Sequence, residues 1–98
     1  MQNLSVAELL EGKHILQEIQ IKGWVKTFRS NRFIALNDGS TLKNIQCVID
    51  FEQTTESVLK KISTGAAVEI KGVLVESQGK GQTVEIQVSE ILILGESN

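Results

Sequence analysis

Residues 18–28, EIQIKGWVKTF, decide the fold class of this chain. Ile19, Ile21 and Val25 occupy every second position together with Gly23, and polar or aromatic side chains stand between them. An alternation with a period of two is typical of a β-strand that turns one face toward a core. The segment therefore predicts a long strand.

Four further segments repeat this alternation. They predict strands over residues 33–36, 42–50, 67–76 and 83–92. Arg29-Ser30-Asn31 predicts a tight turn, Asn37-Asp38-Gly39-Ser40 a hairpin turn, and residues 77–82 a glycine-rich loop. In the third strand Ile45, Cys47 and Ile49 share the inner face, although Asn44 interrupts the alternation near its start. The chain is thus mostly β-structure.

Two short segments have helical spacing instead. Ser5-Val6-Ala7-Glu8 is a capping box, with a Glu three residues after the capping Ser, and predicts a helix that ends by Gly12. Residues 55–63 place Val58, Leu59 and Ile62 in one apolar stripe, followed by Gly65 as the expected C-cap.

The order of three strands, a helix and two strands predicts an all-β fold, a five-stranded OB-fold barrel with the helix between strands three and four. Gly23 and Gly72 lie within predicted strands and suit a strongly bent barrel wall. An SH3-like barrel is the main alternative, but it does not need an amphipathic helix at that position. Residues 1–98 are expected to form a single domain.

Composition limits the possible functions. The chain has 98 residues, 41% of them hydrophobic and 22% charged, which is typical of a globular domain. The longest apolar run covers residues 91–94, too short to span a membrane, and no secretory signal is present at the N-terminus. The single cysteine fits a reducing compartment, so a cytoplasmic location is expected.

The distribution of charge favours a nucleic-acid partner more than the net charge of −2 does. Residues 20–50 carry five basic and two acidic side chains, a balance of +3, whereas the remainder carries five and ten, a balance of −5. A solvated surface can produce such a difference, but a local basic stripe is also what a phosphate-binding surface requires.

No catalytic constellation is found. The chain has one histidine, His14, and Cys47 shares a predicted inner face, so a buried inert thiol is expected. The loop Gly79-Lys80-Gly81 lacks the spacing of a phosphate-binding P-loop and joins two strands. We therefore predict neither a catalytic residue nor a metal or other cofactor in this segment.

The predicted outer face of the barrel is more informative. Alternation turns outward a set of aromatic, amide and charged side chains: Trp24, Lys26, Phe28, Phe33, Gln46 and Glu85. Such a mixture on an OB-fold barrel is a common platform for single-stranded nucleic acid, with bases stacked on aromatic rings and phosphates held by basic side chains. For Trp24 we favour packing over a barrel end. Packing remains an alternative for the other two aromatics, for Phe28 beneath the turn and for Phe33 against Phe28.

Several stretches resemble a known family. Residues 23–30, GWVKTFRS, and 33–40, FIALNDGS, resemble the N-terminal anticodon-binding domain of class IIb aminoacyl-tRNA synthetases. Residues 43–50, KNIQCVID, and 77–85, SQGKGQTVE, are most similar to the asparaginyl-tRNA synthetase branch, with the aspartyl branch as the alternative. The resemblance covers residues 6–94.

The resemblance implies roles for particular residues. Phe33 matches the aromatic that stacks on the central uracil of the anticodon, and Gln46 matches the glutamine that hydrogen-bonds this base. Arg29 matches a basic residue at the end of the family's first strand that contacts the anticodon loop, although the pattern of this sequence places Arg29 in the turn. Glu85 matches an acidic residue of the last strand near the first anticodon base. Basic side chains complete the expected nucleic-acid-binding set: Lys26 and Arg32.

The resemblance also implies a larger protein. Its catalytic domain, absent from this chain, would activate asparagine with ATP and Mg²⁺ and form a homodimer, whereas the isolated segment is expected to be a monomer that binds tRNA. Two alternatives stay open: a sequence-tolerant single-stranded nucleic-acid-binding module, and a protein-interaction barrel without a role in nucleic-acid binding.

Overall fold

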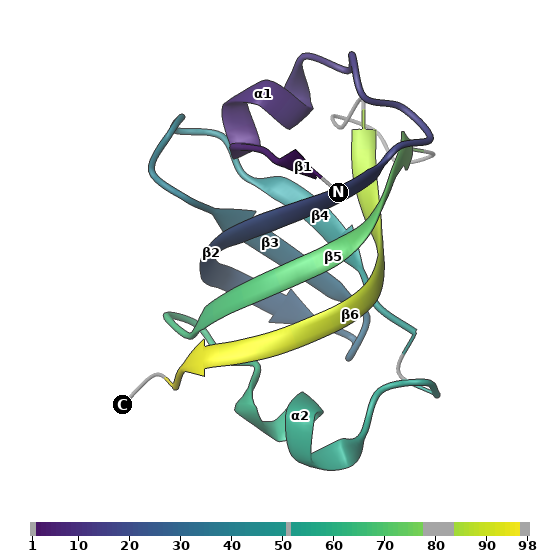
Figure 1. Cartoon of the computed structure of the whole chain (residues 1–98). Coiled ribbons are helices and arrows are strands. Elements are labelled where there is room, and N and C mark those ends of the chain that lie inside the picture. The colour runs from purple at the N-terminus through teal and green to yellow at the C-terminus, as the bar shows by residue number, and fades with distance from the viewer. Residues whose placement is uncertain (1, 51, 78–83, 97–98) are drawn as a thin grey trace.

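A computed structural model of the chain describes residues 2–50, 52–77 and 84–96, so most of the predicted glycine-rich loop lies outside the described residues. Five strands form a barrel, and a helix lies at each of its two ends (Figure 1). The elements are β1 (Gln2–Asn3), α1 (Val6–Leu10), β2 (Glu18–Arg29), β3 (Phe33–Asn37), β4 (Ile45–Val48), α2 (Glu56–Lys61), β5 (Ala67–Glu76) and β6 (Val84–Gly95).

The barrel closes because β2 is long enough to pair on both sides. Its second half pairs antiparallel with β3, and its first half pairs antiparallel with β5. The circuit continues from β3 to β4, from β4 to a parallel β6, and from β6 back to β5. β1 adds a short parallel pairing to β2. With α2 between the third and fourth barrel strands, this is the predicted OB-fold.

The interior is apolar, as the alternation predicted. Ile19, Ile21 and Val25 of β2 are almost completely buried, as are Ile45, Cys47 and Ile49. A Cβ atom on Gly23 would collide with the carbonyl oxygen of Asn37, and one on Gly72 with that of Gln87. The two mid-strand glycines therefore allow neighbouring backbones to approach closely where the wall bends.

The two helices close opposite ends of the barrel. α1 begins with the predicted capping box between Ser5 and Glu8 and buries Val6 and Leu9. α2 begins at Thr55, and the buried Ile62 directly follows it. The expectation that Gly65 caps α2 is wrong, because the C-cap is Ile62, which has an extended backbone. Gly65 (φ 91°) lies in the following turn, and its own amide donates a hydrogen bond to the Val25 carbonyl. Neither helix has the length and apolar character needed to span a bilayer within the described residues.

The connection between β3 and β4 (residues 38–44) differs from the prediction. The third barrel strand begins at Ile45 rather than at Leu42, because the preceding residues wrap around the buried side chain of Asn37. The Asn37 Nδ2 donates to the Thr41 and Lys43 carbonyls and to the Asn44 Oδ1, each at 3.0–3.1 Å. These bonds replace strand pairing and fix the shape of the connection.

The same connection holds α1 in place. The Asp38 Oδ2 accepts a 3.0 Å hydrogen bond from the Val6 amide, and the Ser40 Oγ accepts one of 3.0 Å from the Ala7 amide. Both are amides of the first helical turn, which lack partners within the helix. Partial burial by itself would raise the pKa of Asp38, but hydrogen bonds from Ser40 and from the Val6 amide outweigh it and hold the pKa below 3.8.

Candidate nucleic-acid interface

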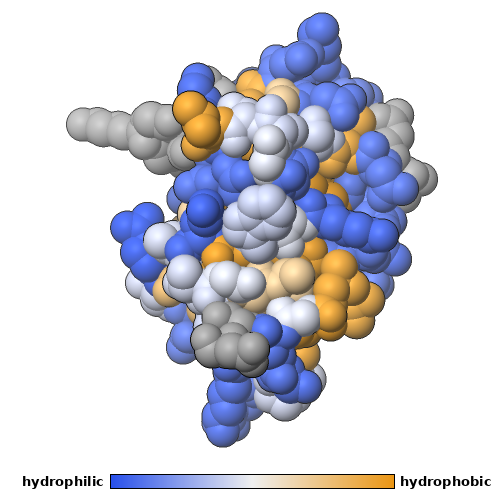
Figure 2. Space-filling model, turned by 90° about the vertical axis from the view of Figure 1, so that its left-hand side faces the viewer, coloured by the Kyte–Doolittle hydropathy of each residue, from blue (hydrophilic) through white to orange (hydrophobic). Residues whose placement is uncertain are grey.

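The side of the barrel that carries the β3–β4 connection is largely polar (Figure 2). Hydrophobic side chains form separate patches on this side. Two large apolar residues are exposed near the connection: Leu42 fully and Trp24 to 41%. The Trp24 ring lies against Gly39 of the turn. The ring of Trp24, which alternation predicted on the outer face, thus packs against the β3–β4 turn.

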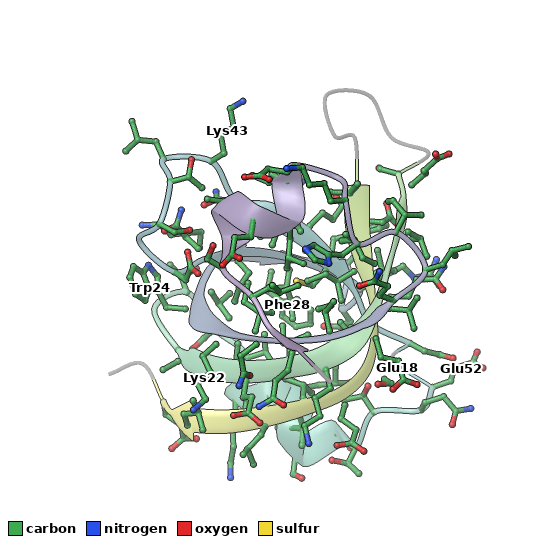
Figure 3. All side chains as sticks on the ribbon, turned by 45° about the horizontal axis from the view of Figure 1, so that its top comes forward. Glu18, Lys22, Trp24, Phe28, Lys43 and Glu52 are labelled. Atoms are coloured by element: carbon green, nitrogen blue, oxygen red, sulfur yellow. The ribbon has the colours of Figure 1, made fainter. Side chains whose placement is uncertain are left out.

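A bulge in β2 changes which side chains face outward. The pairing register between β2 and β3 shifts between Val25 and Thr27, so the strict alternation of the first half of the strand breaks. The prediction that Phe28 faces outward is therefore wrong. Phe28 pairs with the buried Ile34 and packs against the core, and Figure 3 shows its ring inside the barrel.

The same bulge brings Arg29 onto the outer face. The prediction that it lies in the turn is wrong, because Arg29 is the last residue of β2 and pairs directly with Phe33. The turn itself comprises the three residues between them: Ser30 and Asn31 have positive φ, and the Arg32 amide donates a 3.1 Å hydrogen bond to the Arg29 carbonyl. Two consecutive left-handed residues thus set the Arg29 and Phe33 side chains opposite one another.

Two rows of side chains cross the outer wall from strand to strand. In the first, Thr27 pairs with Ala35, Ala35 with Gln46, and Gln46 with Glu85. In the second, Arg29 pairs with Phe33, Phe33 with Val48, and Val48 with Gln87. Directly paired residues share a face, and neighbouring rows are close enough for long side chains to meet. The outer wall therefore presents an aromatic ring, an amide and a guanidinium as neighbours.

The β2, β3 and β4 ends of these rows, from Thr27 and Arg29 to Phe33 and Gln46, form one wall of an open groove of about 560 Å³. Its other walls come from the end of α1 and from the β3–β4 connection, which contribute Leu10 and Leu42. We call this the outer groove. The polar and aromatic side chains that line it are Thr27, Arg29, Phe33, Lys43, Asn44 and Gln46. Phe33 and Gln46 are half-buried, so each keeps a surface open to a ligand.

The charge of its lining residues separates the outer groove from the hollow around Arg32. Among its lining residues in the described chain, Arg29 and Lys43 are basic and none is acidic. The hollow around Arg32 also contains Asp50 and Glu52. Unopposed positive charge next to an aromatic ring is the combination that binds a phosphate and its base together.

Gln46 also has a charged neighbour. Its Nε2 donates a 3.3 Å hydrogen bond to the Glu85 Oε1 across the parallel pair of β4 and β6. The two residues are 39 positions apart in the chain, so only barrel closure brings them together. The amide of Gln46 therefore has a defined orientation before any ligand binds.

The predicted site residues thus divide into two groups. Arg29, Phe33 and Gln46 share the outer groove, and Glu85 touches it through Gln46. Lys26 lies at the bulge and lines a separate hollow beside the β3–β4 turn, and Arg32 lines a third.

The outer groove also contains residues that sequence reasoning missed: Thr27, Lys43 and Asn44. Lys43 belonged to the positive stretch, and Figure 3 shows it projecting from the β3–β4 connection. Asn44 was visible as the break in the alternation of the third predicted strand. Thr27 had no signal, because its outward position follows from the bulge.

We find no cluster of candidate catalytic side chains among the described residues. Burial raises the pKa of the Cys47 thiol, which keeps the sulfur protonated and unreactive. The His14 Nδ1 lies 3.0 Å from the Gln17 Oε1 on the surface. In the described ranges no three His, Cys, Asp or Glu side chains meet as metal ligands.

Comparison with known proteins defines the class. A family model described as an OB-fold nucleic acid binding domain, of the tRNA anti-codon type, matches residues 19–94. This range covers all five barrel strands except the first residue of β2 and the last of β6. The chain therefore belongs to this family of OB-fold nucleic acid binding domains.

Several of the similar proteins are asparagine–tRNA ligases. Over 98 residues the chain is 49% identical to the asparagine–tRNA ligase of Porphyromonas gingivalis, covering 97% of the chain and 21% of the relative. It is 45% identical to that of Parabacteroides distasonis, covering 92% and 20%. The solved asparaginyl-tRNA synthetase of Entamoeba histolytica in complex with asparaginyl-adenylate is 30% identical, with a TM-score of 0.81 over the whole chain and 24% of that structure. The chain thus spans about a fifth of the length of the curated relatives it matches.

Proposed function

We propose that the outer groove binds the anticodon loop of asparagine tRNA and reads its central uracil. The observation that carries this proposal is the placement of Phe33 and Gln46 beside Arg29 and Lys43 in a groove without acidic lining residues in the described chain. The ring of Phe33 would stack on the base, and the amide of Gln46 would hydrogen-bond its edge. Arg29 and Lys43 would hold the flanking phosphates, with Lys26 and Arg32 as outer contacts for the RNA backbone.

The similarity to asparagine–tRNA ligases supports a role within a longer enzyme. In that role the chain is one domain of an ATP-dependent ligase that charges tRNA with asparagine, and anticodon binding positions the tRNA for a catalytic domain elsewhere. On the same proposal, the enzyme uses Mg²⁺, forms a homodimer through its catalytic domain and is located in the cytoplasm. The isolated segment would be a monomer.

The test is binding of an asparagine anticodon stem-loop to Phe33→Ala and Gln46→Ala variants. A stacked base contributes about 1–3 kcal/mol, so Phe33→Ala should weaken binding by roughly 5- to 150-fold. Gln46→Ala should reduce the preference for the central uracil over cytosine, because the direct contact to the base edge is lost. Titration calorimetry or fluorescence anisotropy at two salt concentrations measures both effects.

Matched controls lie outside the outer groove. Trp24→Ala removes an exposed aromatic ring and Gln20→Ala an amide of β2, and neither residue lines the outer groove. Both variants should bind as the unmodified protein does. Equal binding of a poly-pyrimidine DNA would indicate a sequence-tolerant module instead. Binding without salt dependence would argue against phosphate contacts altogether.

A further inference from the structure

The hydrogen bond between Gln46 and Glu85 bears on how the outer groove could select a base. A carboxamide carries a donor and an acceptor at its two ends, and rotation by 180° about its last bond exchanges them. Uracil presents an N–H between two carbonyl oxygens, whereas cytosine presents an acceptor nitrogen beside an amino group. A freely rotating Gln46 could therefore satisfy either pyrimidine, and stacking on Phe33 does not distinguish them.

Glu85 removes this freedom. A carboxylate offers only acceptor oxygens, so the Nε2 of Gln46 must face it, as the 3.3 Å bond shows. In the flipped orientation the Gln46 Oε1 would face the Glu85 Oε1, and two acceptors would repel one another. One N–H of the amide is used by Glu85, and the second N–H and the carbonyl oxygen remain for a base.

The strand pairing holds this arrangement. Gln46 and Glu85 are directly paired across β4 and β6, and Glu85 pairs with Val75 of β5 on its other side. Glu85 thus lies in a central strand of the wall, and both members of the pair are half-buried. The rigid backbone on both sides limits how far the two side chains can move apart.

We infer that Glu85 is a positioning residue that locks the amide of Gln46 in the orientation that accepts uracil and rejects cytosine. This inference rests on the proposed function and deepens it, because it names the device by which the outer groove distinguishes two pyrimidines. The locked carbonyl oxygen accepts from the uracil N3–H, and the free amide N–H donates to the uracil O4, the position that cytosine occupies with its amino group. Cytosine in the same pose meets an acceptor with an acceptor and a donor with a donor.

The test compares the affinities for two anticodon stem-loops that differ only in a central uracil or cytosine. For the unmodified protein we expect a uracil preference of roughly 5- to 150-fold. In Glu85→Gln the new amide can pair with either orientation of Gln46, so the preference should fall at least tenfold or vanish, chiefly through tighter binding of the cytosine loop. A merely structural role of Glu85 would weaken both loops and would not produce this gain.

Control variants separate the effect of removing a negative charge from the effect of releasing the Gln46 amide. Glu90→Gln makes the same change of charge on the exposed face of β6, where Glu90 lies 3.9 Å from Lys71, and should leave the preference unchanged. Glu85→Asp keeps the charge but withdraws the carboxylate from Gln46, and should also reduce the preference. In a Gln46→Ala background, Glu85→Gln should no longer alter the ratio of the two affinities.

Failure of the proposed function and failure of the positioning role of Glu85 would give different results. If the unmodified protein does not prefer the uracil loop, the proposed function fails. If it does prefer this loop and Glu85→Gln retains the full preference, the positioning role is wrong while the proposed function stands. An effect of Glu85→Gln that persists without Gln46 would mean that Glu85 touches the base directly, which also overturns the inference.

Discussion

The two helices close the barrel by different means. α1 is held by hydrogen bonds that the amides of its first turn donate to the side chains of its own Ser5 and of Asp38 and Ser40 in the β3–β4 connection. α2 has no buried residue within Glu56–Lys61 and rests on the core through half-buried side chains such as Val58 and Leu59. One end of the barrel is thus held by directional polar contacts together with the buried Val6 and Leu9, and the other is covered mainly by partial apolar packing.

This difference matters because of where each helix lies. α1 ends in Leu10, which lines the outer groove, and the connection that holds α1 also carries Lys43 and Asn44 of that groove. α2 lies at the opposite end of the barrel (Figure 1). Polar fastening fixes a helix at a defined position, whereas partial apolar packing tolerates small displacements. The more closely defined end is the one that shapes the proposed binding surface.

The largest contrast should come from the same substitution in each helix. Leu9→Ala removes a fully buried side chain and should lower the free energy of unfolding by about 2–5 kcal/mol. Leu59→Ala removes a half-buried one and should cost roughly 1–2 kcal/mol. Urea unfolding followed by circular dichroism measures both values. Equal losses would show that α2 is packed as firmly as α1.

A smaller and pH-dependent contrast concerns Asp38. Asp38→Ala leaves the Val6 amide and the Ser40 hydroxyl without their acceptor, and should lower the free energy of unfolding by about 1–2 kcal/mol at pH 7. The pKa of Asp38 is lower in the folded state than the ordinary 3.8, so its stabilisation is complete above that value and is lost as the pH falls through the folded pKa.

The measurement is urea unfolding of both proteins between pH 7 and pH 2.5. The difference in stability should narrow below pH 3.8, because the unmodified protein then loses the charged acceptor too. A difference that stays constant over this range would show that the charge of Asp38 does not hold α1.

The smallest effect is expected at the start of α2. Thr55→Ala removes the N-cap of this helix, whose Oγ1 accepts from the Val58 amide at 3.4 Å, longer than the 3.0 Å bond from Val6 to Asp38. The loss should be about 0.5–1 kcal/mol. Because a hydroxyl does not titrate in this range, the loss should be the same at pH 7 and pH 3. A loss that depends on pH would mean that α2 is fastened by charge as well.

Much of the fold could be predicted because the barrel obeys local rules. The period of two in β2 assigned Ile19, Ile21 and Val25 to the interior, and the element order predicted the OB-fold. What failed was the second half of β2. No residue type marks a bulge, and a single inserted residue exchanges the inner and outer faces beyond it, so Phe28 was assigned to the wrong face. Arg29 was assigned to the turn because the strand was expected to end one residue earlier than it does.

The candidate site was predictable in part for the same reason. Phe33 and Gln46 lie on strands without a bulge in their pairing, so alternation placed them correctly on the outer wall. Lys43 and Asn44 depend on the loop that Asn37 organises, and the bond from Gln46 to Glu85 depends on the parallel pairing of β4 with β6. Contacts between residues far apart in the chain leave no periodic trace in the sequence.

The position of Glu85 on β6 has a consequence during biosynthesis. Until β6 has left the ribosome, β4 lacks its parallel neighbour and Gln46 lacks the carboxylate that orients it. Domains fold as units while the chain emerges from its N-terminus. If the outer groove binds RNA as proposed, a nascent chain that has exposed Phe33 and Arg29 could bind it through stacking and charge before it could select a pyrimidine. On the same proposal, selectivity for the base would arise only with the last strand, as a property of the complete barrel.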